Sequence, residues 1–118
     1  MYGIPRNIDW SFFIGAEIFE IIMGSNYVIV KFMPEISLWI MSAFHHWPTQ
    51  IDYFYDTTLA EQAVSLVKLF GVTVESVKVT NDTDLALHLS NGEILNIYDQ
   101  NPHLESFHII YEGGRIVV

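Results

Sequence analysis

His45 and His46 are the residues whose types come closest to a metal or acid–base site. Adjacent residues of a strand point to opposite faces, so the two rings are poorly placed to bind one ion. A metal site would need distant partners such as Asp52 or His108. We therefore interpret the pair as part of a surface or interface loop, and we expect neither a bound metal nor a cofactor.

Asn81, Asp82 and Asp84 resemble the start of a calcium-binding loop. Such a loop also needs a glycine and a bidentate glutamate at fixed spacing, and both are missing here. The stretch is therefore interpreted as a solvated turn.

No other group of residues has the pattern of a catalytic site. The serines lack the context of a nucleophile elbow, and Gly113-Gly114 has no helix after it to bind a phosphate. The carboxylates are scattered over turns and strand ends, which is typical of a solubilising surface. We expect a protein that is not an enzyme. An enzyme with His45, His46 or His108 as base ranks last, because no nucleophile is visible beside a base.

The charge balance bears on the kind of partner. The chain has 118 residues, fourteen of them acidic and five basic, with a formal net charge of −9. This charge repels nucleic-acid backbones and anionic membranes and favours encounter with a basic protein. The alternative is that an acidic balance is ordinary for an intracellular protein.

Cysteine is absent, which excludes disulfides and cysteine zinc sites. The N-terminal residues lack the basic region and apolar core of a signal peptide. No apolar run approaches the ~20 residues of a membrane span. We therefore expect a cytoplasmic location and no membrane partner.

One connection mixes large aromatic residues with aspartates, over residues 45–56. Tryptophan and tyrosine are enriched where protein interfaces draw their energy, and carboxylates among them select a basic partner. The alternative is that these aromatic residues complete the core. The predicted partner-binding residues are Trp47, Asp52, Tyr53, Tyr55 and Asp56, with Asp82 and Asp84 in reserve.

The secondary structure on either side of residues 45–56 is predicted from an apparent internal repeat in the sequence. When Gly15 is laid on Gly71, an offset of 56 residues, the apolar positions of the two stretches match. Past the first turn the offset becomes 57, and Val28 then meets Leu85. The alternative is that any two alternating β segments align in this way. We predict a single domain, residues 1–118, with repeats at about 12–56 and 68–118.

Alternating apolar residues predict a strand-rich chain. In the first repeat we expect strands at 16–23, 27–33 and 36–44, a break at 45–50, and a fourth strand at 51–55. In the second repeat Asn91-Gly92 is a strong hairpin signal, and residues 75–76 indicate a bulge. The expected strands there are 72–80, 85–89, 93–99, 105–111 and 115–118, with 51–54 opposite 108–111.

One helix is predicted at about residues 59–70. Thr58 and Glu61 form a capping box, Leu66 and Phe70 lie at helical spacing on its apolar side, and Gly71 ends it. A short helical turn is favoured at 8–14, capped by Asp9.

The predicted fold class is α+β and mainly antiparallel β. About eight strands form two duplicated meanders in a curved sheet or partly open barrel, and the helix covers an open end or face. The predicted core comprises Ile18, Ile21, Val28, Val30, Leu38, Ile40, Leu66, Val74, Val77, Leu85, Leu87, Leu95 and Ile97.

Three stretches resemble a family of small bacterial β-rich proteins. They are the Gly-x-x-[Ile/Val] strand start, the hairpin Leu85-x-Leu87-x-Leu89-Ser90-Asn91-Gly92-x-x-Leu95, and Glu105-Ser106-Phe107-x-Ile109. Some such acidic proteins are similar to immunity proteins of contact-dependent inhibition and other polymorphic toxin systems. The resemblance implies a binding protein that neutralises a toxin domain by occluding its active site. It carries over no binding residue, because immunity proteins bind through surfaces that vary between pairs.

A basic toxin is the expected partner, with a nuclease the expected type because nucleases have basic substrate clefts. The runner-up function is a small-molecule or lipid-binding barrel whose aromatic residues line a cavity. Homodimerisation through a free strand edge at 115–118 is a further option.

Overall fold

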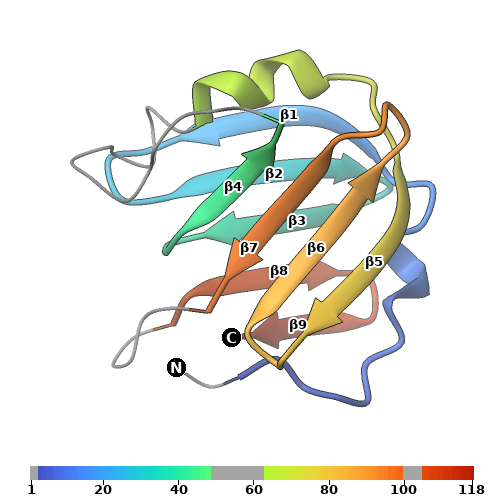
Figure 1. The fold of residues 1–118 in the computed structure, drawn as a ribbon, viewed down its shortest axis with the longest axis vertical. Helices are drawn as coiled ribbons and strands as arrows, with labels where there is room; N and C mark the ends of the chain where they lie inside the picture. Colours follow the sequence, from blue (N-terminus) through green and yellow to red (C-terminus); the bar gives the residue numbers. More distant parts are fainter. Residues whose placement is uncertain (1–2, 49–62, 100–104) are drawn as a thin grey trace.

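The computed structural model describes residues 3–48, 63–99 and 105–118, and these form two antiparallel sheets and two 3-10 helices (Figure 1). One sheet has five strands in the order β1-β2-β3-β8-β9, and the other has four in the order β4-β7-β6-β5. The mainly antiparallel β fold is thus confirmed. The elements are η1 (Trp10–Phe13), β1 (Glu17–Met23), β2 (Val28–Met33), β3 (Ile36–Ile40), β4 (Phe44–Trp47), η2 (Val64–Leu69), β5 (Val74–Thr80), β6 (Asp84–Leu89), β7 (Ile94–Tyr98), β8 (Phe107–Tyr111) and β9 (Gly114–Val117).

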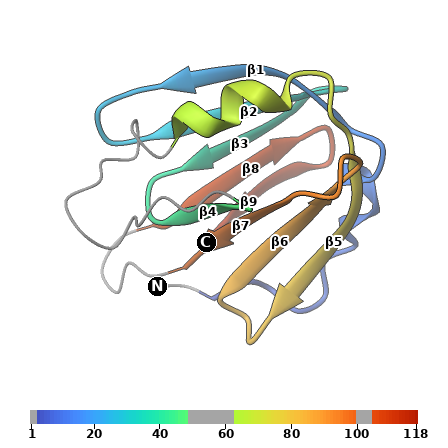
Figure 2. The ribbon, with the colours of Figure 1, turned by 45° about the horizontal axis from the view of Figure 1, so that its top comes forward.

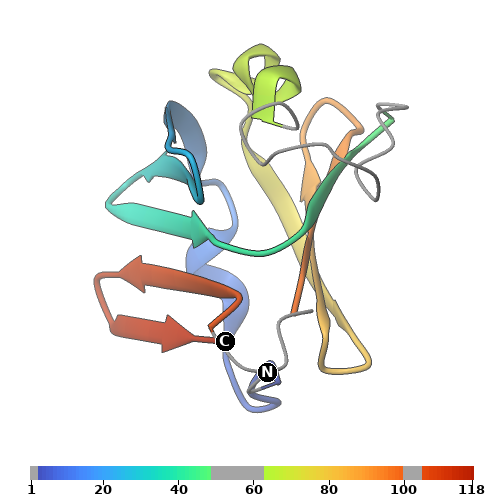
Figure 3. The same ribbon diagram turned by 90° about the vertical axis from the view of Figure 1, so that its left-hand side faces the viewer.

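The two sheets lie face to face and are not closed into a barrel (Figure 3). After β3 the chain crosses from the five-stranded sheet to the four-stranded one, where β4 pairs with β7. After β7 the chain crosses back, and β8 pairs with β3. Each three-stranded meander therefore has its fourth strand in the opposite sheet.

The two meanders have the same hydrogen-bonding register. Ile21 pairs with Val30 in the first, and Val77 pairs with Leu87 in the second, which reproduces the offsets of 56 and 57 residues. The register slips between Ile18 and Glu20 in β1, and at the equivalent place, between Val74 and Ser76, in β5. The bulge predicted at 75–76 is therefore confirmed.

Reciprocal hydrogen bonds relate the two meanders by a pseudo-two-fold axis. Gly15 N donates to Val74 O (2.7 Å), and the equivalent Gly71 N donates to Ile18 O (2.8 Å). An isolated bridge joins Glu17 to Thr73, which are themselves 56 residues apart. Gly15 and Gly71 have φ of +86° and +85°, a conformation that other residues rarely adopt.

The break predicted at 45–50 is wrong in its first half, because β4 occupies Phe44–Trp47. Pro48 follows the last residue of this strand, where it displaces no ladder hydrogen bond. By pairing, β4 is the equivalent of β8, with Phe44 matching Phe107 at an offset of 63 residues. The match proposed between 51–54 and 108–111 therefore fails, and the strand predicted at 51–55 lies outside the described residues.

The predicted helix at 59–70 is described only from residue 63 onward, where η2 is a 3-10 helix. Three residues per turn place Ala63, Leu66 and Leu69 on the buried side. Phe70, assigned to the apolar side by α-helical spacing, is instead exposed. Thr58 and Glu61 lie outside the described residues. The helical turn capped by Asp9 is confirmed as η1, since Asp9 Oδ1 accepts from Ser11 N (3.0 Å).

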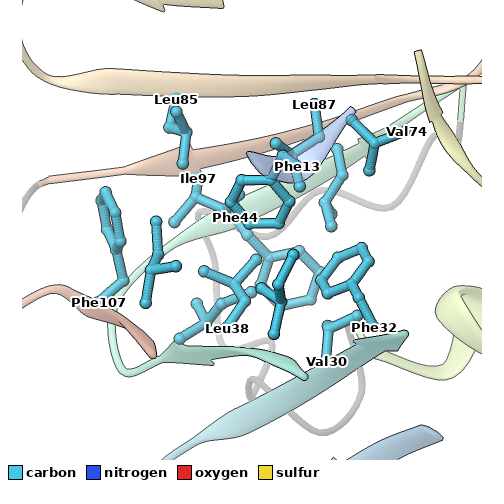
Figure 4. Close-up of a cluster of buried hydrophobic side chains, with 14 of the residues drawn as sticks. Phe13, Val30, Phe32, Leu38, Phe44, Val74, Leu85, Leu87, Ile97 and Phe107 are labelled. Atoms are coloured by element: carbon cyan, nitrogen blue, oxygen red, sulfur yellow. The ribbon is translucent and has the colours of Figure 1, made fainter. Parts of the chain in front are cut away.

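The core fills the space between the sheets (Figure 4). Phe13, Phe32, Phe44 and Phe107 are fully buried there. All the predicted core residues are buried except the equivalent pair Ile21 and Val77, which are half-buried and pack against the core. Both lie on edge strands, β1 and β5, where one flank has no neighbouring strand.

Candidate functional site

Two predicted partner-binding residues, Trp47 and Asp84, lie on the outer face of the four-stranded sheet. Trp47 is 50% exposed and pairs across the ladder with Ile94 of β7, whereas Asp84 of β6 pairs with Tyr98 at the other end of β7. Four residues of strand separate these pairs, about 13 Å. The structure therefore places Trp47 and Asp84 on one face but at opposite ends of it.

Asp82 lies in the β5–β6 turn, where it anchors the N-terminal arm. Its carboxylate accepts from Arg6 Nη2 (2.7 Å), and its carbonyl accepts from Ile4 N (2.7 Å). The hydrogen bond and the charge of Asp82 raise the pKa of the Arg6 guanidinium. Much of the Asp82 charge is thus balanced within the molecule.

Asp52, Tyr53, Tyr55 and Asp56 lie outside the described residues, so their role in partner binding stays a prediction. Among the predicted partner-binding residues of the connection at 45–56, Trp47 lies within the described residues, and its side chain is exposed.

A row of exposed apolar side chains runs along η2. Val64, Val67 and Phe70 are 60%, 44% and 51% exposed and form what we name the apolar ridge. Val64 and Val67 of η2 and its C-cap Phe70 are three residues apart, so they share one face, a third of a turn from the face of the buried Leu66 and Leu69. Sequence reasoning missed this ridge because it applied α-helical spacing. The apolar residues at 64, 67 and 70 are spaced by three, and this spacing could have indicated a 3-10 helix with an exposed apolar face.

The end of the apolar ridge lies next to a strand that carries two exposed carboxylates. Phe70 precedes Gly71, whose N–H donates to Ile18 O, and this bond places the end of the ridge beside β1 (Figure 2). On β1 the flanking residues Glu17 and Glu20 are exposed. An exposed apolar ridge with acidic neighbours can contact a partner surface that is itself apolar and basic.

A set of polar side chains around the buried His46, which we name the polar network, lies beneath η2. His46 of β4 is only 3% exposed; its Nδ1 is 2.9 Å from Ser65 Oγ of η2, and its Nε2 contacts Glu93 Oε1. Asn91 Nδ2 donates to the other oxygen of Glu93 (2.7 Å). This polar network therefore fastens η2, which carries the apolar ridge, to the four-stranded sheet.

At the positions equivalent to His46 and Glu93, the other half of the molecule has apolar residues. His46 pairs with Leu95, and its equivalent Ile109 pairs with Leu38. At an offset of 57, Ile36 corresponds to Glu93, and both isoleucines are buried. The same architecture thus forms with apolar residues at these positions, so the fold itself does not require the His46–Glu93 pair.

The histidines do not converge on a metal site. His45 and His46 point to opposite sides of β4, as predicted, although they lie on a strand rather than in a loop. His108 belongs to the other sheet. Among the residues that the structure describes, no group of three or more histidine or acidic side chains could hold a metal ion.

Comparisons with known proteins found no matching family model, no similar curated protein and no similar solved structure. No helix in the described part of the chain is long and apolar enough to cross a membrane.

Proposed function

We propose that this protein is an immunity-type binding protein that neutralises a basic toxin domain, of the nuclease class, by occluding its active site. The observation that carries the proposal is the exposed apolar ridge, whose end lies next to β1, on a molecule with a net charge of −9. Such a protein acts in the cytoplasm of the toxin-producing cell, where it protects that cell in contact-dependent inhibition.

The ridge and the charge contribute differently to binding. A nuclease cleft that receives phosphates is basic, so a field of carboxylates attracts it and accelerates encounter. Apolar side chains that become desolvated in the complex then slow dissociation. Val67 and Phe70 are 44% and 51% exposed, so about half of each side chain is available for this contact.

The side chains packed between the sheets in the described part of the chain favour binding by the outer surface over the alternative of a small-molecule or lipid-binding barrel. That alternative needs aromatic residues that line a cavity. Phe13, Phe32, Phe44 and Phe107 instead fill the space between the sheets (Figure 4).

The test uses the toxin encoded by the neighbouring reading frame, with survival on co-expression and the association rate as readouts. We expect protection, and an association rate that falls at least tenfold between about 50 and 300 mM salt. Val67→Ser with Phe70→Ser should raise the dissociation rate about tenfold or more. Ile14→Ser is the matched control, because Ile14 is the exposed equivalent of Phe70 at the offset of 56. Absence of protection, or salt-independent association, would reject the proposal.

A second candidate function is favoured by one observation, the contact between Ser65 Oγ and His46 Nδ1. A hydroxyl beside an imidazole that is in turn held by a carboxylate is the arrangement of an activated nucleophile. If Ser65 acts in this way, a fluorophosphonate reagent should label it in the native protein but not in His46→Gln. The absence of label on native Ser65 would eliminate this candidate.

A further inference from the structure

The β2–β3 hairpin carries a groove that the proposed function does not yet use. Two surface hollows of about 480 Å³ each lie on either side of this turn and share Pro34 and Ile36. The first is lined by the turn and by Phe19 and Met33, and we name it the hairpin groove. Phe19 and Met33 are 46% and 55% exposed, whereas Ile36 and Phe32 form a buried floor.

The second meander serves as an internal comparison for this groove. Its equivalent hairpin keeps the same strand register but has polar or small residues at the equivalent positions. Phe19, Met33, Pro34 and Glu35 correspond to Glu75, Ser90, Asn91 and Gly92. The hairpin of the second meander therefore forms without large apolar side chains at these positions. The fold does not require the exposed Phe19 and Met33 in the first meander.

The charges at the groove are mostly negative. Glu35 lines it, and Glu17 pairs with Met33 across the β1–β2 ladder. Both carboxylates are exposed, and neither forms an ion pair with a described residue. The one lining cation, Lys31, has its Nζ 3.8 Å from Glu20 Oε1 and is partly neutralised.

We infer that the hairpin groove binds an aromatic or aliphatic side chain of the basic partner, with flanking lysine or arginine residues paired to Glu17 and Glu35. This inference rests on the proposed function and names the chemistry of the partner segment. The apolar walls take the anchor side chain, and the two carboxylates select cations on either side of it. The groove thus recognises a short cationic segment with one apolar residue.

The probe is the peptide acetyl-Lys-Lys-Phe-Lys-Lys-amide, observed through the ¹³C-labelled ε-methyl groups of the methionines of the full chain. Met33 lies in the groove and Met23 lies at the opposite end of β1, so the two signals report on different places. We expect the Met33 signal to shift saturably at peptide concentrations of about 1 mM while the Met23 signal stays in place. Peptides with alanine for phenylalanine, or with glutamate for lysine, should bind at least about fivefold more weakly.

Two variants remove the apolar walls without adding a charge. Phe19→Ser and Met33→Ser should each weaken peptide binding about fivefold or more. Because Met33→Ser lacks the methyl signal, its binding is followed through the backbone amide signals of the hairpin. The matched control is Met23→Ser, since Met23 is also an exposed methionine of the same strand pair. It should leave the affinity unchanged.

The outcomes separate the inference from the proposed function. Binding of the lysine peptide without a shift at Met33 would overturn the groove assignment and leave a basic partner supported. A Met33 shift of equal affinity with the glutamate peptide would overturn the cation selection, and with it the basic partner, while keeping the apolar site. No binding of any of these peptides would overturn the inference, even if the neighbouring toxin were still neutralised.

Discussion

His46 and Glu93 occupy positions where the other half of the molecule has isoleucines. Replacing His46 alone by isoleucine leaves Glu93 and Ser65 without their buried partner, and we expect a loss of about 1–3 kcal/mol in the free energy of unfolding. The double replacement His46→Ile with Glu93→Ile should recover most of this loss, because the equivalent positions 109 and 36 are both buried isoleucines. Urea unfolding of the single and double variants measures the coupling. Additive losses would show that the two side chains do not act as a pair.

Asp9 provides a prediction on pH. The hydrogen bond from the Ser11 backbone N–H lowers the pKa of Asp9, so the folded state favours the ionised carboxylate. Its stabilising contribution is therefore complete above about pH 4 and is lost as the pH falls through the lowered pKa. In Asp9→Asn the amide still caps η1 but does not titrate. The stability difference between the wild type and this variant should shrink between pH 7 and pH 3. A difference that grows would contradict the cap.

The contacts of single residues were the least accessible to sequence reasoning. His46 was interpreted as a loop residue because its partners Ser65 and Glu93 are 19 and 47 residues away, and no spacing rule links them. Asp82 was interpreted as a surface acid, and its pairing with Arg6 across 76 residues was equally invisible. Burial of core residues was predictable because it follows from alternation along each strand.

Gly15 and Gly71 start β1 and β5 in the same way, and this predicts equal sensitivity to substitution. Both have positive φ, and an added Cβ would meet nothing within 4 Å at either position. The cost of Gly15→Ala and of Gly71→Ala is therefore conformational, about 1–2 kcal/mol each. Asparagine tolerates this conformation better, so Gly15→Asn should cost less than Gly15→Ala in urea unfolding. Unequal alanine costs at the two sites would weaken the pseudo-symmetry.

The elements were predicted well where a hairpin or an alternating pattern defines them. The register of β1–β2 and β5–β6 was predictable because apolar parity fixes which residues share a face. The type of η2 was not, because apolar residues at 63, 64, 66, 67, 69 and 70 fit both an α-helix and a 3-10 helix with two apolar sides. Tertiary packing against the core and the contact of Ser65 with His46 decide which side is buried.

The net charge of the molecule predicts how fast it meets a basic partner. Asp52→Asn with Asp56→Asn removes two charges from the predicted connection and should lower the association rate with the toxin about threefold to tenfold, with little change in the dissociation rate. Asp9→Asn with Glu112→Gln is the matched control, since it removes the same charge from two exposed positions outside the connection. Stopped-flow or surface-plasmon kinetics measure both rates. Equal effects of the two double variants would show that the connection has no special part in binding.

The arrangement of the two sheets could not be read from the sequence. The repeat suggested two similar meanders, and each meander does pair as expected. The placement of β4 in the opposite sheet depends on the crossing of the chain at residues 41–43, and a four-residue strand gives almost no pattern of its own. Tertiary pairing with β7 determines this strand.

The placement of β4 and β8 in opposite sheets predicts what happens when the polypeptide is cut into two fragments. If it were cut between residues 49 and 62, the first fragment would carry β4, which belongs to the sheet of the second, and the second would carry β8 and β9, which belong to the sheet of the first. Neither fragment could then complete its sheet alone, but the two fragments would complement each other on mixing.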